Sequence, residues 1–169
     1  MLRVRSTMTR NVVTVSSEDS LCEAFDLMRT EGFRHLPVVD GNRLIGVLSD
    51  RDVLLRAEPD GEQIIVPEEN VEQAMSLNPI TCGPRSSISD AARVMNERKI
   101  SCLPVVETDG TLIGLITATD LLDLLCQYEE VRREDTIPVS YRLTPMALWK
   151  EGPGLAGRST ENGSYIPAS

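Results

Sequence analysis

A short polar motif occurs twice in this chain of 169 residues. Each copy has a glycine, two apolar residues, a hydroxyl residue, two variable residues and an aspartate. The hydroxyl residue and the acid are Ser49 and Asp52 in the first copy, and Thr117 and Asp120 in the second. Each motif follows an apolar run and opens a helical pattern, where free amides suit a phosphate and a carboxylate can accept both hydroxyls of a ribose. The motif is therefore compatible with nucleotide binding.

The same spacing has a second interpretation. A Ser or Thr followed three residues later by an acid is typical of a capping box, in which the hydroxyl accepts from amides of the first helical turn. An acid at this place also suits the dipole of the helix. The motif alone leaves capping and ligand binding open.

The surroundings of the first motif are more basic than those of the second. Arg34, His35 and Arg51 accompany the first copy, whereas serine, cysteine and threonine occupy the matching positions of the second. If each motif serves its own cleft, the first cleft is better equipped for phosphate, and we expect tighter nucleotide binding there. The alternative interpretation makes the arginines solvated surface charges and gives His35 a structural role.

A catalytic function has little support in the sequence. There is no Gly-x-Ser-x-Gly, His-Glu-x-x-His or Walker-type motif, and the chain has a single histidine. Asp50 and Asp52 do not face each other if both lie on one helix. We therefore predict a binding protein with no catalytic residues, no metal site and no required cofactor, rather than an enzyme.

The two motifs belong to an internal repeat. The run Leu-Pro-Val-Val at 36–39 recurs at 103–106, and Leu-Ile-Gly at 44–46 recurs at 112–114. The second copy has one extra residue in the turn between these runs, where an insertion does least harm. A fixed period of this length is typical of tandem units that complete one another's core.

Each repeat is predicted to run strand, helix, strand, strand, helix. In the first repeat, residues 12–15 form a β-branched run, and the runs at 36–39 and 44–48 form a hairpin around an Asp-Gly turn. A helix is expected to begin after Ser20 and to end at Gly32. Its apolar side chains recur at helical spacing: Leu21, Ala24, Phe25 and Met28.

The repeats set the predicted domain organisation. Residues 1–57 are assigned to the first repeat with its lead-in segment, 58–67 to a linker, 68–132 to the second repeat, and 133–169 to a tail. The second repeat is expected to begin with a lead-in helix over 68–75. The end of the tail is rich in Gly, Ser and Pro, so we expect an extended or flexible tail.

These features together resemble a CBS domain, and the two repeats resemble the CBS pair known as a Bateman module. The resemblance rests on His35–Val39, a glycine-containing turn, Leu44–Gly46 and Ser49-x-x-Asp52, and on their recurrence in the same order. It implies an α/β (α+β) fold in which two β-α-β-β-α units pack with pseudo-twofold symmetry and leave two clefts. In that family the clefts hold AMP, ADP, ATP or S-adenosylmethionine.

The resemblance also implies roles for individual residues. Asp52 and Asp120 would bind the ribose hydroxyls, Ser49 and Thr117 would contact ribose or phosphate, and the segments around Thr14 and Thr81 would line the clefts. We therefore expect a stand-alone regulatory protein that binds an adenosine nucleotide and signals to a partner or an oligomer by a conformational change. The alternative is a scaffold or dimerisation module with vestigial ligand sites.

Composition limits the partners. The net charge of −9 and the pI of about 4.7 argue against nucleic acid. Four cysteines lack zinc-like spacing, so we expect them to be reduced and mostly buried in a cytoplasmic protein. No signal peptide and no membrane span is expected, since no apolar run approaches roughly 20 residues. By resemblance we expect a homodimer formed through a helix face that bears Leu121, Leu122 and Leu125.

Overall fold

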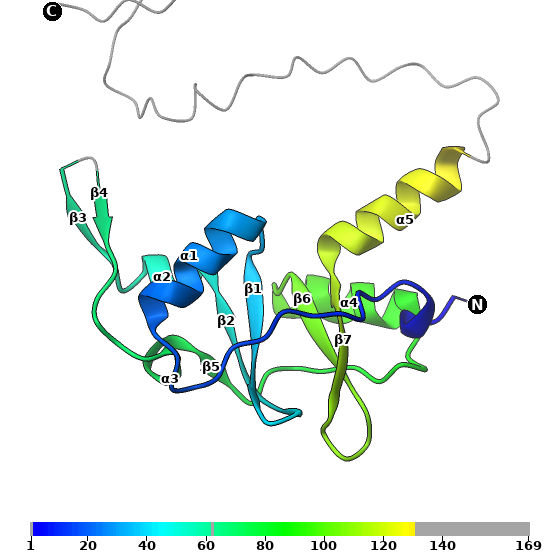
Figure 1. Cartoon of the computed structure of the whole chain (residues 1–169). Coiled ribbons are helices and arrows are strands. Elements are labelled where there is room, and N and C mark those ends of the chain that lie inside the picture. Colours follow the sequence, from blue (N-terminus) through cyan, green and yellow to red (C-terminus); the bar gives the residue numbers. More distant parts are fainter. Residues whose placement is uncertain (1, 62, 131–169) are drawn as a thin grey trace, which may run out of the picture. The chain divides into compact units, whose positions relative to one another are not determined.

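The computed structural model describes residues 2–61 and 63–130, which contain helices and small sheets (Figure 1). The predicted tail, 133–169, lies outside the described residues. The elements of the first half are η1 (Val4–Ser6), α1 (Leu21–Glu31), β1 (His35–Asp40), β2 (Arg43–Ser49) and α2 (Asp50–Leu54). They are followed by β3 (Glu58–Asp60), β4 (Gln63–Ile65), α3 (Val71–Ala74), β5 (Ser76–Leu77), α4 (Ile88–Arg98), β6 (Cys102–Val106), β7 (Leu112–Thr117) and α5 (Ala118–Glu130).

The first predicted helix, α1, is confirmed with both of its ends. Ser20 Oγ accepts from Glu23 N at 3.4 Å. Gly32 ends the helix in the left-handed conformation, with a φ of 73° that a residue without a side chain adopts at no steric cost. The predicted apolar face is buried in the core: Leu21, Ala24, Phe25 and Met28.

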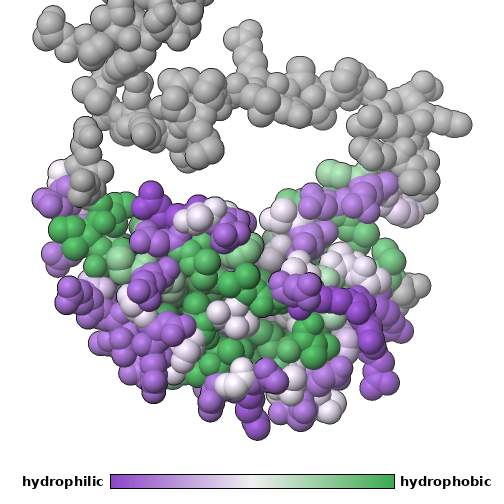
Figure 2. Space-filling view, in the orientation of Figure 1, coloured by the Kyte–Doolittle hydropathy of each residue, from purple (hydrophilic) through white to green (hydrophobic). Residues whose placement is uncertain are grey.

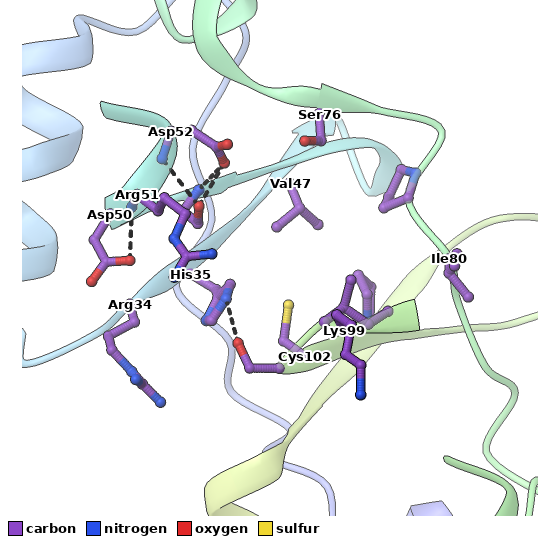
Figure 3. Close-up of a pocket in the computed structure, with 15 residues that line it drawn as sticks. Arg34, His35, Val47, Asp50, Arg51, Asp52, Ser76, Ile80, Lys99 and Cys102 are labelled. Atoms are coloured by element: carbon purple, nitrogen blue, oxygen red, sulfur yellow. Dashed lines mark hydrogen bonds between the residues drawn. The ribbon is translucent and has the colours of Figure 1, made fainter. Parts of the chain in front are cut away.

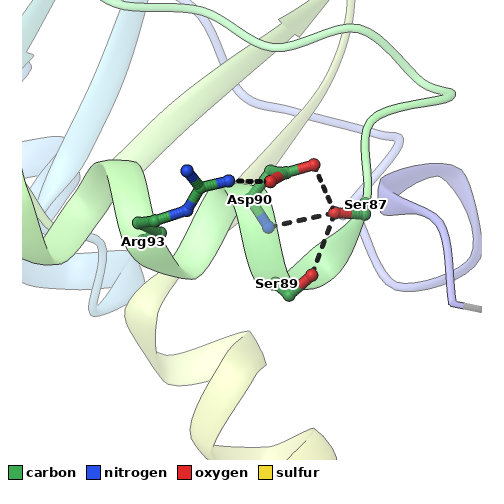
Figure 4. A network of polar contacts seen from close by, with 4 residues as sticks. All are labelled: Ser87, Ser89, Asp90 and Arg93. Carbon is green, nitrogen blue, oxygen red and sulfur yellow. Dashed lines mark hydrogen bonds and ion pairs between the residues drawn. The ribbon is translucent and has the colours of Figure 1, made fainter.

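Helix α4 is capped by a polar network in its first turn (Figure 4). Ser87 Oγ accepts from Asp90 N at 3.0 Å and donates to Asp90 Oδ2 at 2.6 Å, and Arg93 donates to the same carboxylate. Ser89 Oγ lies 3.0 Å from Ser87 Oγ and shares a hydrogen bond with it. The hydrogen bonds from Ser87 and Arg93 lower the pKa of Asp90. The network fixes where α4 begins, as Ser20 does for α1.

The first predicted strand is wrong in its extent, because only Val15 pairs with the sheet. Val15 N donates to Pro37 O at 3.1 Å, and Val39 N donates to Val15 O at 2.9 Å, which makes one parallel bridge beside β1. The chain before Val15 pairs with the other half of the molecule, where Thr9 bridges to Leu115. One segment therefore serves both halves, and this division limits its pairing with each.

The two predicted hairpins are confirmed. β1 pairs antiparallel with β2, β6 pairs antiparallel with β7, and both hairpins carry a register shift before their last valine, Val39 or Val106. The first sheet continues to β5, which gives the strand order β1-β2-β5. In the second half, the bridge between Thr9 and Leu115 takes the place that β5 has in the first. The two halves therefore follow one plan.

Each half completes its core with the segment that precedes the other half. Val71, at the start of α3, is fully buried in the core of the first half, with Ala74 and Met75 packed beside it. Val4, in η1, is fully buried in the core of the second half, with Met8 beside it. The expected lead-in helix is shorter than predicted, since Met75 is already extended, and it packs on the first half.

Two glycines allow these exchanged segments to reach the strands. A Cβ on Gly46, in β2, would lie 2.7 Å from Met75 Sδ and 3.1 Å from Ser76 O. A Cβ on Gly114, in β7, would lie 2.9 Å from Thr9 O. The glycine of each Leu-Ile-Gly run is therefore a packing requirement, because a larger residue would push the exchanged segment away from its strand.

A small apolar cluster joins the two halves. Val47 of β2, Cys102 of β6 and Leu115 of β7 are buried together, with Val12 packed against them. The tips of the hairpins also exchange two backbone hydrogen bonds, of 3.2 and 2.9 Å. The predicted pair of packed α/β repeats is thereby confirmed.

The stretch between the repeats has more structure than a polar turn. β3 and β4 pair around Gly61, whose φ is 61°, and form a small hairpin that projects beyond α2 (Figure 1). Ile64 and Ile65 of this hairpin are 57% and 52% exposed. Figure 2 shows apolar surface at its base. The chain is less symmetric here, since α2 has five residues and α5 has thirteen.

The predicted burial of the cysteines is wrong for two of them. Cys102 is buried and Cys82 is half-buried, whereas Cys22 and Cys126 are exposed on helix surfaces. Cys22 follows a fully buried residue, Leu21, but successive helical residues point about 100° apart. All four thiols are free. Burial raises the pKa of Cys102 to about 12 and that of Cys82 to about 11, so both stay protonated near neutral pH.

Gly46→Ala is expected to lower the free energy of unfolding by about 1–3 kcal/mol, because its methyl group would collide with Met75 and with the Ser76 carbonyl. Gly83→Ala is the matched control, since a Cβ there would meet nothing within 4 Å. Urea denaturation of both variants tests the prediction, and equal losses would contradict it.

Candidate functional site

Ser49 and Asp52 form a closed capping box at the start of α2 (Figure 3). Asp52 Oδ2 accepts from Ser49 N at 2.9 Å and from Ser49 Oγ at 2.6 Å, while Asp52 N donates to Ser49 Oγ at 3.2 Å. Thr117 and Asp120 repeat this arrangement at 2.6, 2.8 and 3.3 Å. The capping interpretation of the motif is therefore confirmed in both halves.

Capping leaves part of each carboxylate available. All the hydrogen bonds of the box reach Oδ2 of Asp52, and within the described residues no group donates to Oδ1. Asp52 is half-buried, so its orientation is fixed while one oxygen can still accept from a ligand hydroxyl. Because α2 has only five residues, side-chain cations rather than its dipole would have to supply most of the attraction for any anion bound here.

A cavity of about 510 Å³ lies beside this box, between the two halves (Figure 3). It contains five of the residues singled out from the sequence: Ser49, Asp52, Arg34, His35 and Arg51. Its other lining residues are Val47, Asp50, Ser76, Pro79, Ile80, Lys99, Ile100, Ser101, Cys102 and Pro104.

The floor of the cavity is apolar and belongs to the junction of the halves. Val47 and Cys102 are 8% and 7% exposed and are part of the joining cluster, and Pro104 is buried next to them. Ile80 and Ile100 line the same cavity from the second half. This surface suits the flat face of an aromatic base, because stacking there would bury apolar area on both partners.

The rim of the cavity carries charge of both signs. Arg34, Arg51 and Lys99 are exposed, and the half-buried carboxyl groups of Asp50 and Asp52 lie on the α2 side. Lys99 Nζ makes one long hydrogen bond, 3.5 Å, to Asn96 Oδ1. Within the described residues, neither guanidinium donates to a protein group, so these cations are not held in place by strong hydrogen bonds.

His35 connects the two halves at the edge of the cavity. Its Nε2 lies 3.1 Å from Ser101 Oγ, in a hydrogen bond between residues 66 apart in the chain. Burial lowers the pKa of His35; Asp50 opposes the shift, Arg34 adds to it, and Asp52 opposes it. A predominantly neutral imidazole is expected at physiological pH, and such a ring can accept from or donate to the serine.

The structure places the other predicted site residues elsewhere. Asp120 lines a hollow of about 270 Å³ with Ser6, Thr7 and Asp123, a lining that contains no cationic side chain. Thr14 lines another hollow, of about 180 Å³. The two remaining residues, Thr81 and Thr117, line none of these three hollows. The two halves therefore present different surroundings at their motifs.

Sequence reasoning missed the contribution of the second half to the cavity. Lys99 could have been found, because it stands 67 residues after Gly32, where a helix-ending glycine was expected. Pro79 and Ile80 precede Thr81, which was singled out, and it is they that line the cavity. Ser76 could not have been found, because it reaches the cavity only through the exchange of lead-in segments.

The protein family follows from comparison with known proteins. The model of the CBS domain matches residues 4–58 and 71–127, which are the two repeats. The chain therefore belongs to the CBS domain family and contains a pair of such domains. Among the described residues, no helix is both long and apolar enough to cross a membrane.

Three similar proteins illustrate the range of this family. The chain is 43% identical over 119 residues to an inosine-5'-monophosphate dehydrogenase of Korarchaeum cryptofilum, with 70% of this chain but only 23% of that protein covered. It is 35% identical to the CBS domain-containing protein YhcV of Bacillus subtilis, over 72% of this chain and 84% of YhcV. CBSX2 of Arabidopsis thaliana, solved in complex with AMP, has a TM-score of 0.68 and 29% identity, covering 76% of this chain and 99% of that chain.

Acidification is expected to destabilise the wild type more than His35→Gln. Because the pKa of His35 is lowered on folding, the unfolded chain takes up its proton first, near its ordinary value of about 6.5. Stability is therefore full above that pH and is lost as the pH falls through the folded-state pKa. His35 is the single histidine of the chain, so the difference between the two melting-temperature profiles from pH 7.5 to 5 isolates it. Parallel profiles would contradict the prediction.

Proposed function

We propose that this chain is a regulatory module that binds an adenosine nucleotide in the cavity between its repeats. The observation that carries the proposal is the lining of that cavity, in which Ser49 and Asp52 of one half and Ser101 and Cys102 of the other meet around an apolar floor. AMP, ADP and ATP are the first candidates, and S-adenosylmethionine is a further one.

The lining supports one orientation of the ligand. The base would lie on the apolar floor beside Val47 and Cys102, because these are buried apolar groups of the cavity. A ribose hydroxyl would donate to the Oδ1 atom of Asp52 that the capping box leaves available. The phosphate would then lie toward the cationic rim, where Arg34 and Arg51 can donate charge-assisted hydrogen bonds.

The relatives support an adenosine ligand. CBSX2, whose fold this chain shares over 76% of its length, has been solved in complex with AMP. YhcV is matched over most of its own length, so CBS pairs without a further large domain exist among the relatives. We infer that the present chain uses its cavity in the same way, with the first motif as the principal binding site and the second as a weaker one.

Regulation would follow from the position of the ligand between the halves. A nucleotide that contacts Asp52 and Ser101 at the same time favours the arrangement of the halves in which both contacts are made. The hydrogen bond between His35 and Ser101 crosses the same junction and would respond to that change. A partner protein or a second copy of the chain would then bind preferentially to one arrangement of the halves.

Catalysis is not part of the proposal. The cavity holds one imidazole and two carboxylates, and one of these carboxylates is committed to a helix cap. The dehydrogenase relative is matched over only 23% of its length, so its activity is a property of a much longer protein. We infer a binding protein that acts in the cytoplasm.

A scaffold or homodimer is the second candidate function. Leu122 and Leu125 of α5 are 61% and 54% exposed and would be buried by a second copy of the chain. Leu121, the third residue of the predicted face, instead packs against the core of the second half. A dimer through α5 is compatible with ligand binding, because this face lies outside the residues that line the cavity.

Calorimetric titration of AMP tests the proposal. Asp52→Ala is expected to weaken binding by about 10- to 100-fold, since it removes a charged hydrogen-bond acceptor for the ribose. Asp120→Ala is the matched control, because it removes the same capping contacts in the other half. Equal losses from the two variants would contradict the ranking of the sites.

A thermal-shift panel separates the two candidate functions. A ligand that binds only the folded state raises the melting temperature, so AMP, ADP or ATP should do so at concentrations above their dissociation constants. No shift with these nucleotides or with S-adenosylmethionine would reject the nucleotide proposal and favour the scaffold.

A further inference from the structure

Lys99 occupies a backbone position that favours glycine. It ends α4 with a φ of 57° and a ψ of 36°, in the left-handed region, and it is one of two non-glycine residues with a positive φ in the described part of the chain. The corresponding residue that ends α1 is Gly32, with a φ of 73°. A side chain at this position costs conformational energy that glycine avoids. The second half therefore has a lysine where the backbone conformation favours glycine.

The side chain of Lys99 lies at the cavity. It lines the cavity opposite Asp50 and Asp52 (Figure 3). Its amino group makes only the long contact with Asn96, so it is available to a ligand. The first half has nothing comparable, because glycine carries no side chain into the corresponding place.

Lys99 changes the charge balance of the cavity. Together with Arg34 and Arg51 it supplies three permanent cations, against the carboxylates of Asp50 and Asp52. A ribose hydroxyl bound to Asp52 would leave the three cations for the group attached to the 5' carbon of the ribose. That group is a phosphate with a charge of roughly −1.5 to −2 in AMP. In S-adenosylmethionine it is a sulfonium with an amino-acid arm, which carries a net positive charge.

We propose that Lys99, acting with Arg34 and Arg51, makes this cavity selective for 5'-phosphorylated adenosine over S-adenosylmethionine. The inference rests on the proposed function and goes further, since it names the ligand class and the residue that decides it. Lys99 belongs to the second half, whereas Asp52, which would bind the ribose, belongs to the first. A phosphorylated ligand would therefore contact both halves. An unphosphorylated nucleoside would lack the phosphate contact with Lys99.

A purely local role for Lys99 makes different predictions. A cation in the last turn of a helix also interacts favourably with the carbonyl end of its dipole. Lys99→Gln removes the charge and keeps the strained backbone, whereas Lys99→Gly removes the charge and relieves the strain. Arg98→Gln is the matched control, because it removes one neighbouring exposed charge from a residue that does not line the cavity.

The experiment measures the affinities of AMP, adenosine and S-adenosylmethionine for the full chain and these three variants by calorimetry. The wild type is expected to bind AMP at least about tenfold more tightly than adenosine and to bind S-adenosylmethionine more weakly than adenosine. Both Lys99 variants should lose about tenfold in AMP affinity with little change for adenosine. Arg98→Gln should retain the wild-type preference, and only Lys99→Gly should raise the melting temperature without ligand.

Each contrary result has a separate meaning. Equal wild-type affinities for AMP and S-adenosylmethionine would overturn the selectivity while leaving an adenosine-binding function standing. An unchanged AMP preference in both Lys99 variants would overturn the role of Lys99. No binding of any of the three compounds by the wild type would overturn the proposed function, and this inference with it.

Discussion

The exchange of lead-in segments is the constraint on which the rest of the structure depends. Val71 fills the core of the first half although it precedes the second, and Val4 does the reverse. Each repeat by itself would bury little apolar surface and would be only marginally stable. The exchange joins the two cores and brings the chain after α3 directly to the cavity, where Ser76, Pro79 and Ile80 form one wall.

The candidate site combines side chains that are held by hydrogen bonds with exposed side chains that can move. The capping box holds Ser49 and Asp52 through hydrogen bonds of 2.6 to 3.2 Å, so their geometry exists before any ligand arrives. Preorganised groups of this kind lose little entropy on binding. The side chains of Arg34, Arg51 and Lys99 are exposed and can adapt to the length of a phosphate chain. In the proposed complex, helix capping would use Oδ2 of Asp52 and the ribose would use Oδ1, so the two roles would not compete for one oxygen atom.

Local patterns predicted the parts of the fold that depend on neighbouring residues. The spacing of residue types predicted the repeats, the helix capped by Ser20, the hairpins and the capping box. The sequence could not predict the exchange, because Val71 has the same apolar character whichever core it fills. It also could not predict that the first strand shrinks to a bridge at Val15, since the competing partner of that segment lies in the other half. For the candidate cavity, the motif and the arginines near it were predicted from the sequence. Lys99 was missed, although it stands 67 residues after Gly32 and therefore takes its place in the second repeat.

The hydrogen bond between His35 and Ser101 crosses the junction of the two halves beside the cavity. The repeat aligns Arg34 with Ser101 and His35 with Cys102, and all four of these residues line the one cavity. Equivalent positions of the two repeats therefore meet at this single cavity. A molecule that displaced these side chains from within the cavity would disturb both repeats at once.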